Sequence, residues 1–267
     1  MDHQSTPKHR NGRKKIYFAS DFHLGVPTYK ASLEREKLLV QWLDEVRPDA
    51  EAIFLMGDIF DFWFEYKSVI PKGFVRLLGK LAEITDSGTP VHLFKGNHDI
   101  WASSYLQTEI GIELHSSKLI ARFGDKCFFL AHGDGLGPGD TAYKFMKKLF
   151  QNRFNQRLFR WLHPDLGTRI ALFFSRKSRR ANNMKEEKNG NPPLQDEMLY
   201  KYSLRKSEQY PEIDYFLFGH RHLPTNVKLN DKARLVILGD WINHFTYAVF
   251  DGNHLELKYY LNGKPNS

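Results

Sequence analysis

Aspartate, histidine and asparagine side chains gather in five short segments of this 267-residue chain. The segments are Asp21-Phe22-His23, Gly57-Asp58, Gly96-Asn97-His98-Asp99, Ala131-His132-Gly133-Asp134 and Gly219-His220-Arg221-His222. Oxygen and imidazole ligands without a thiolate suit Mn, Fe or Zn. Two such ions, about 3.5–4 Å apart, need a bridging anion, and a single carboxylate can span them while other oxygens and imidazoles complete each coordination sphere. Asp58 is the predicted bridge.

Each of these segments follows a short apolar run. The runs are residues 16–20, 52–56, 91–95, 127–131 and 215–218. Their enrichment in β-forming residues is typical of strands buried on both faces. Gly57, Gly96 and Gly219 permit a sharp turn or a positive φ directly after a strand. Because open α/β sheets hold ligands beyond their strand ends, all five segments are predicted to converge at one edge of a sheet.

Taken singly, each segment also has a purely structural interpretation. An Asp-x-His or Gly-Asp sequence is common in turns and helix caps, and the His220-x-His222 pair could likewise be purely structural. Their joint occurrence after strands favours a metal centre. Asp99 and Asp134 are predicted to orient imidazoles or loop amides. The other histidines receive no predicted role; these are His3, His9, His92, His115, His163, His244 and His254.

Length and composition indicate one catalytic domain. With 41% hydrophobic residues the chain can bury a large core, and its one cysteine, Cys127, excludes an intramolecular disulfide. Residues 1–15 are basic and lack the apolar core of a secretion signal, so they are predicted to be a flexible tail before a domain over residues 16–267. No stretch supplies the ~20 apolar residues of a membrane span. We expect a cytoplasmic protein.

Positive charge is concentrated between Lys144 and Arg180. Eleven basic residues there face one acidic residue, Asp165, so the segment carries +10 in a chain whose net charge is +8. Apolar residues recur every four positions from Met146 to Leu162, which predicts an amphipathic helix ending at His163-Pro164. A second helix is predicted after Gly167, and residues 185–193 are predicted to form a polar loop. These helices would form a cap inserted at about residues 137–185.

The cap has several possible roles. Basic and apolar side chains together could bind an anionic membrane, or could cover a pyrophosphate and acyl chains. Basic clusters with aromatics also bind nucleic acid, but the chain has no recognisable nucleic-acid-binding module, so nucleic acid is an unlikely partner. Alternatively the apolar stripe packs on the catalytic core and the charges are solvated.

The remaining sequence supplies a scaffold. Residues 32–46 and 74–84 are predicted helices, and residues 235–238, 245–250 and 255–259 are predicted strands with an Asp-Gly hairpin between the last two. Alternation of helices with apolar strands predicts an α/β sandwich.

The order D-x-H, GD, GN-H-D, H-G-D, GH-x-H resembles that of the calcineurin-like metallophosphoesterase superfamily. The resemblance implies an α/β fold, a β-sandwich flanked by helices with an inserted helical cap. It implies two divalent ions, with Mn²⁺ favoured over Fe or Zn. One site would consist of Asp21, His23 and His222. The other would consist of Asn97, His132 and His220, with Asp58 between the two.

Four further phrases resemble the UDP-2,3-diacylglucosamine pyrophosphatase family of lipid A biosynthesis, over residues 16 to 250. They are GDIFDFW at 57–63, HGDGL at 132–136 followed by Asp140 and Tyr143, RRAN at 179–182, and LGDW at 238–241. This resemblance implies hydrolysis of UDP-2,3-diacylglucosamine to UMP and 2,3-diacylglucosamine 1-phosphate. The resemblance also implies that the protein acts at the cytoplasmic face of the inner membrane, where it would bind peripherally.

The narrower resemblance also implies substrate contacts. Arg180 is expected near the pyrophosphate, Asp140 and Tyr143 near the sugar or nucleoside, and Asn97 at the substrate as well as the metal. His98 stands where many family members carry Arg, and is expected to stabilise charge at phosphorus or to protonate a leaving oxygen. The alternatives are a dimetal phosphodiesterase or phosphatase for a soluble nucleotide or nucleic acid, and a non-catalytic binding scaffold.

Overall fold

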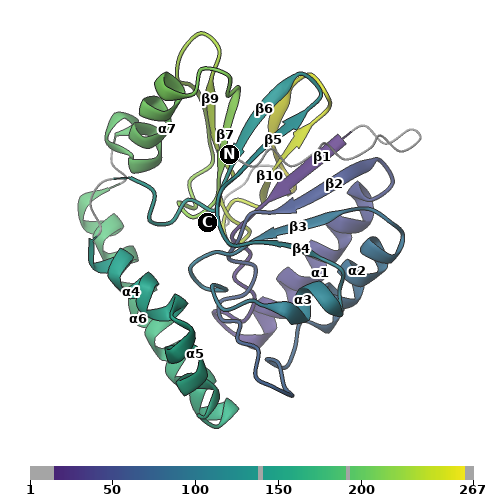
Figure 1. Ribbon diagram of the computed structural model, residues 1–267, viewed down its shortest axis with the longest axis vertical. Coiled ribbons are helices and arrows are strands. Elements are labelled where there is room, and N and C mark those ends of the chain that lie inside the picture. The colour runs from purple at the N-terminus through teal and green to yellow at the C-terminus, as the bar shows by residue number, and fades with distance from the viewer. Residues whose placement is uncertain (1–14, 138–140, 191–192, 262–267) are drawn as a thin grey trace.

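The computed structural model describes residues 15–137, 141–190 and 193–261, and for residues 142 and 178–189 it describes the backbone alone. The predicted basic tail therefore lies outside the described residues, apart from Lys15. The described chain forms two β-sheets with helices on both outer sides and a helical arm that extends from one end (Figure 1).

The first sheet has six strands in the order β11-β10-β1-β2-β3-β4. They are β1 (Lys15–Ala19), β2 (Ala50–Leu55), β3 (Val91–Phe94), β4 (Glu113–His115), β10 (Thr246–Phe250) and β11 (Leu255–Tyr259). Strands β1 to β4 are parallel, and β10 and β11 add antiparallel pairs at one side. The three predicted strands of this sheet that precede ligand segments are thus neighbours, which brings their carboxyl ends together.

The second sheet has five strands in the order β5-β6-β7-β9-β8. They are β5 (Leu119–Phe123), β6 (Lys126–Leu130), β7 (Tyr215–Phe218), β8 (Thr225–Lys228) and β9 (Arg234–Ile237). Strands β6, β7 and β9 are parallel, so the segments after β6 and β7 emerge at the same end of this sheet.

An aromatic core joins the two sheets. The ring of Phe18 stacks on Phe54 of its own sheet, with centroids 5.2 Å apart, and on Phe128 of the other sheet at 5.9 Å. All three are almost fully buried. Burial of both faces explains why these strands read as unbroken apolar runs. The predicted α/β sandwich is confirmed.

Helices cover the outer faces of both sheets. Helices α1 (Tyr29–Val46), α2 (Val75–Asp86) and α3 (Ser104–Thr108) pack on the first sheet, and α7 (Met198–Gln209) packs on the second after the short 3₁₀ helix η1 (Leu194–Asp196). Trp42 of α1 shows the packing, because it is fully buried against Tyr17 and Trp241. The two predicted helices of the scaffold are therefore present.

Three helices build the arm, which we call the cap: α4 (Thr141–Gln151), α5 (Arg153–Arg160) and α6 (Pro164–Asn189). The prediction of a single helix from Met146 to Leu162 is wrong in one respect. The chain forms two helices here, and they are separated at Asn152. The Asn152 side chain accepts hydrogen bonds from Phe154 N and Asn155 N and so begins a new helix. Helical periodicity alone does not reveal such an internal cap.

Helix α6 also differs from the prediction at both ends. It begins at Pro164, a residue suited to the first turn of a helix, rather than after Gly167. It continues to Asn189, so the predicted loop at 185–193 is wrong for residues 185–189. None of the helices in the described ranges is long and apolar enough to cross a bilayer.

The cap docks on the sandwich through aromatic rings. Phe159 lies 4.7 Å from Trp101 and 4.8 Å from Phe64, measured between ring centroids. Trp101 Nε1 also donates a hydrogen bond of 2.7 Å to the Phe150 carbonyl. Most other large apolar side chains of the cap are exposed, including Phe154 at 66% and Trp161 at 88% of their surface. The apolar face of the cap helices therefore packs only in part on the core of the sandwich.

Candidate metal centre

The five ligand segments meet where the two sheets end. The prediction of a single sheet edge is wrong, because three segments follow strands of the first sheet and two follow strands of the second. Backbone hydrogen bonds hold the segments together. Asp21 N donates to Gly57 O at 3.0 Å, and Gly219 N donates to His132 O at 2.9 Å. Facing sheets thus supply ligands from both sides of one buried space.

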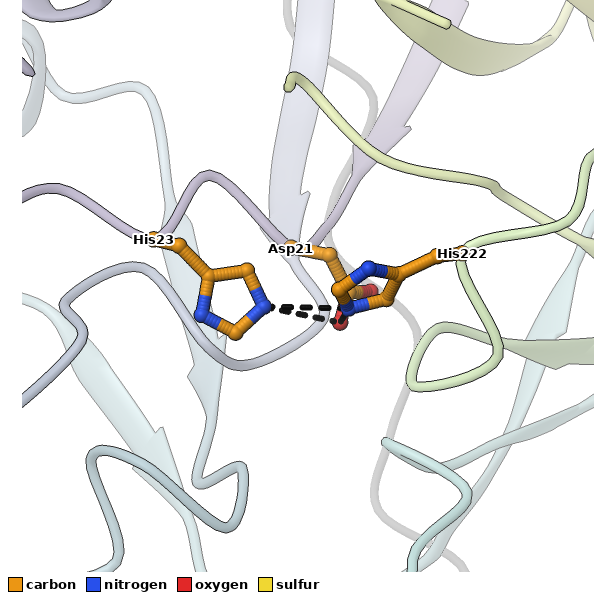
Figure 2. A group of neighbouring side chains, drawn as sticks. All are labelled: Asp21, His23 and His222. Atoms are coloured by element: carbon orange, nitrogen blue, oxygen red, sulfur yellow. Dashed lines mark hydrogen bonds and ion pairs between the residues drawn. The ribbon is translucent and has the colours of Figure 1, made fainter. Parts of the chain in front are cut away.

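Asp21, His23 and His222 form the first group (Figure 2). His222 Nε2 lies 3.2 Å from Asp21 Oδ1, and His23 Nε2 lies 3.8 Å from the same oxygen. The two Nε2 atoms are 3.0 Å apart. Asp21 Oδ1 is buried and has no hydrogen-bond partner among the described residues. Two imidazole nitrogens and a carboxylate oxygen therefore converge as metal ligands do.

Asn97, His132 and His220 form the second group. Asn97 Oδ1 lies 2.9 Å from His220 Nδ1 and 3.3 Å from His132 Nε2. The imidazoles come from the second sheet and the carboxamide from the first, so this group exists only when the sandwich is assembled.

Asp58 lies between the two groups. Its Oδ2 is 3.8 Å from His23 Nε2 in the first group and 3.4 Å from His132 Nε2 in the second. The structure thus brings together all seven side chains predicted as ligands, with the predicted bridge in the middle. Their role in metal binding stays a prediction, but the donor set and its convergence fit two divalent ions.

Each aspartate uses its other oxygen to hold a neighbouring segment. Asp21 Oδ2 accepts from His220 N, and Asp58 Oδ1 accepts from His98 N, both at 2.9 Å. One oxygen of each carboxylate is thereby fixed, and the other faces the ligand groups. The carboxylates cannot rotate away without breaking these bonds.

Neighbouring carbonyl and carboxylate oxygens also fix the ring orientation of the histidines. His132 Nδ1 lies 2.8 Å from the Met56 carbonyl, which can only accept, so Nδ1 carries a proton and Nε2 is the nitrogen that faces the other predicted ligands. Asp61 Oδ1 lies 3.5 Å from His23 Nδ1, and Asp240 Oδ2 lies 3.6 Å from His222 Nδ1. These carboxylates direct both Nε2 atoms at Asp21.

Asp61 and Asp240 were assigned no role from the sequence, although both lie in the phrases GDIFDFW and LGDW. Each is an aspartate next to large apolar residues, and this pattern could have indicated a role, because a buried acid needs a partner. Both are almost fully buried. Asp99 matches its prediction, because its carboxylate accepts from Gly96 N at 2.6 Å and Ile59 N at 2.8 Å and so joins two loops.

The backbone at this centre is strained. Seven described non-glycine residues have a positive φ, and five of them are predicted ligands: Asp21, His23, Asp58, His220 and His222. Each such residue costs of the order of 1–3 kcal/mol. Gly57, Gly96 and Gly219 were predicted to permit a sharp turn or a positive φ, and of the three Gly57 alone has a positive φ. Gly96 and Gly219 are needed for space instead, because an added Cβ would collide with Asp58 and with Ser20 and Asp21 respectively.

The electrostatics of the centre favour positive charge. Burial alone would raise the pKa of Asp58, but the charges of His132 and His98 outweigh burial and hold it well below its usual range. Burial acts to lower the pKa of His132, yet the charge of Asp58 raises it to about 10. Burial and the charge of His132 lower the pKa of His220 to about 4. A space that keeps a proton on a buried imidazole is one that favours a bound cation.

His98 lies beside the first group, with its ring centroid 4.8 Å from that of His23. Its Nδ1 is 3.0 Å from the Asp61 carbonyl, so Nδ1 carries the proton and Nε2 is the nitrogen that can face a substrate. Ser175 of the cap donates to Asp61 Oδ2 at 2.8 Å and lies 3.3 Å from His98 Nδ1. Ser175 thus links cap helix α6 to His98.

Among the predicted substrate contacts, Tyr143 hydrogen-bonds Asp134, whose carboxylate also pairs with Lys147 at 2.6 Å. Asp134 therefore anchors cap helix α4 to the loop that carries His132. Asp140 lies outside the described residues, and so does the side chain of Arg180, whose backbone belongs to α6. These substrate contacts stay predictions.

Ser175→Ala is expected to lower kcat about fivefold with little change in KM. The variant removes a hydrogen bond to a carboxylate worth about 1 kcal/mol and frees His98 from the cap. The measurement is steady-state kinetics of Ser175→Ala and of a control variant, Ser68→Ala, which removes an exposed loop hydroxyl. Equal kcat values for the two variants would contradict the role of Ser175 in positioning His98.

Comparisons with known proteins identify the family. The sequence model of the family described as calcineurin-like phosphoesterase matches residues 14–224. The UDP-2,3-diacylglucosamine hydrolase of Porphyromonas gingivalis is 41% identical over 256 residues, covering 92% of this chain and 97% of that protein. The enzyme of the same name from Haemophilus ducreyi is 29% identical over 84% of this chain and 91% of its own length.

Among solved structures, a dimetal phosphatase from Danio rerio aligns with a TM-score of 0.46 and 14% identity, over 93% of this chain and 96% of that one. The family match spans β1 to the segment that carries His220 and His222, and so includes every predicted ligand. This chain belongs to the calcineurin-like phosphoesterase family.

Proposed function

We propose that this protein hydrolyses the pyrophosphate bond of UDP-2,3-diacylglucosamine, giving UMP and 2,3-diacylglucosamine 1-phosphate. The observation that carries the proposal is the position of Asp58 between two convergent ligand groups, each with two imidazoles, at 3.8 and 3.4 Å from their nearest nitrogens. The substrate follows from the relatives, which bear the name UDP-2,3-diacylglucosamine hydrolase and align over nearly their whole length.

Asp21, His23 and His222 would hold one divalent ion, and Asn97, His132 and His220 the other, with Asp58 shared. Mn²⁺ is the proposed ion, and Fe and Zn also bind such a set of oxygen and imidazole ligands. When bound, such a pair supplies Lewis-acid activation for the attack of water on a phosphoryl group.

The chain's own residues would position the substrate and offset charge. His98 presents Nε2 beside the first ligand group, where it can donate to a phosphoryl oxygen when protonated. Arg180, together with Asn97, would contact the pyrophosphate, while Asp140 and Tyr143 would contact the sugar or nucleoside. The leaving sugar phosphate needs little protonation, so charge stabilisation matters more than acid catalysis by His98.

The cap would bind the acyl chains and the membrane surface. Its exposed apolar side chains include Leu149, Phe154, Leu158, Trp161, Phe173 and Phe174. The surrounding segment carries +10, so it would attract anionic lipids while apolar residues enter the interface. We therefore propose peripheral, salt-sensitive attachment to the cytoplasmic face of the inner membrane.

The proposal is tested by UMP release from the diacylated UDP-sugar and from its deacylated form, with purified protein and Mn²⁺. Faster release from the diacylated substrate is expected. Equal rates would contradict acyl recognition and favour the alternative, a dimetal phosphodiesterase for soluble nucleotides. A nucleic-acid diester in the same assay is expected to be a poor substrate.

Leu158→Glu is expected to lower kcat/KM for the diacylated substrate about 30-fold and to leave a small aryl diester unaffected. Leu158 is 54% exposed on α5, and the loss of about 2 kcal/mol of apolar contact corresponds to that factor. Val75→Glu is the matched control, because Val75 is 73% exposed on α2, outside the cap. A similar loss for both variants, or an equal loss on both substrates, would contradict the cap's role.

A further inference from the structure

Three polar side chains form a second cluster on the edge of the first sheet, on strands rather than on the ligand loops. His92 belongs to β3, and Glu113 and His115 belong to the edge strand β4. In the parallel register His92 pairs with Glu113 and Phe94 pairs with His115. Because side chains alternate along a strand, all three residues face the same side of the sheet.

His92 Nδ1 is the centre of this cluster. It lies 3.1 Å from His115 Nε2 and 3.2 Å from Glu113 Oε2, and one ligand atom from each residue lies within 4.8 Å of the others. Around a tetrahedral ion with bonds of about 2.0–2.1 Å, neighbouring ligand atoms are roughly 3.3 Å apart. Small side-chain adjustments would therefore accommodate an ion.

Aromatic stacking holds both imidazoles in place. The His92 ring stacks on Phe54 with centroids 4.2 Å apart and planes 12° from parallel, and the His115 ring stacks on Phe94 at 4.8 Å. His92 Nε2 is buried without a partner among the described residues, so Nδ1 is the nitrogen that meets the cluster. Rings fixed in this way lose little entropy when they bind a ligand.

Protonation and access also suit metal binding. Burial, followed by the charge of His92, lowers the pKa of His115 to about 4, so this ring is neutral at pH 7. The hydrogen bond from His92 Nδ1 lowers the pKa of Glu113, which keeps the carboxylate ionised, and an ion that binds Nδ1 would displace the proton of this hydrogen bond. The Glu113 side chain is 60% exposed, which leaves an open path for an ion and a coordinating water.

We propose that His92, Glu113 and His115 bind one borderline divalent transition metal such as Zn²⁺, with water as a fourth ligand. Two imidazoles and one carboxylate form a donor set that Zn²⁺ accepts with an open fourth position. The ion ties edge strand β4 to β3 and is separate from the two ions of the candidate metal centre.

The test is a Zn²⁺ titration of the full-length protein after chelator treatment and dialysis, with bound metal measured per chain. Wild-type protein is expected to bind one equivalent more than the Glu113→Gln/His115→Gln variant. His254→Gln, which removes an exposed histidine elsewhere, is expected to match wild type. Since the result is a difference of one equivalent, it holds whether or not the other centre binds two ions.

Unchanged Mn²⁺-dependent turnover of a small aryl diester shows that the double variant is folded. If that variant does not fold, Glu113→Gln alone can be used, because this largely exposed residue contributes little packing. The Zn²⁺ affinity of the extra site is expected to fall at least tenfold in Glu113→Gln. Equal metal content and affinity in wild type and the variants would overturn the proposal.

Discussion

Asp58→Asn is expected to lower kcat/KM about 1,000-fold or more on every phosphate substrate. The side chain keeps its size, and Oδ1 can still accept from His98 N, so the local fold is preserved. The bridging negative charge is lost, however, and with it affinity for a second cation beside His23 and His132. A loss of several kcal/mol of transition-state stabilisation corresponds to this factor.

The measurement is kcat/KM for the diacylated UDP-sugar and for an aryl diester, with saturating Mn²⁺. Asp44→Asn is the matched control, because it removes a carboxylate that is 52% exposed on α1 and pairs with Lys80. Asp44→Asn should retain wild-type activity. Loss of activity on the lipid substrate with a normal rate on the diester would place Asp58 in substrate recognition and contradict the account.

Removing divalent ions is expected to abolish turnover and to lower the melting temperature by about 5–10 °C. Five of the predicted ligand residues have strained backbone, and two buried carboxylates face the same space. An ion at 100 times its Kd stabilises the folded state by about 2.7 kcal/mol, and 1 kcal/mol corresponds to about 2–4 °C in a domain of this size.

Activity and thermal unfolding should be followed together, first in chelator and then after Mn²⁺ is restored. Both should recover, whereas the melting temperature of Asp58→Asn should respond less to Mn²⁺ than that of wild type. Turnover that persists in chelator would contradict metal dependence.

The sequence was sufficient to predict the strands, and the segments that converge where these strands end, for a physical reason. Strands buried on both faces are nearly continuous apolar runs, as in residues 52–56, so a polar residue directly after such a run stands out. Parallel strands then place those residues at one end of a sheet. This reasoning locates Asp58 and His132 without knowledge of which strands are neighbours.

The same reasoning could not assign strands to sheets, because β1 and β6 have the same pattern. It also missed Asp61 and Asp240, whose role depends on ring nitrogens of residues distant in sequence. The break of the cap at Asn152 was missed because an asparagine inside an amphipathic pattern has no visible signature until its side chain caps two backbone amides. Contacts made by folding, rather than periodicity, determine these features.

The most direct test of the account is a crystal structure of the protein with Mn²⁺, with anomalous scattering to locate the ions. Two anomalous peaks are predicted, one enclosed by Asp21, His23 and His222 and the other by Asn97, His132 and His220. The Asp58 carboxylate should be within bonding distance of both. A single peak, or an Asp58 side chain that contacts neither ion, would contradict the central claim.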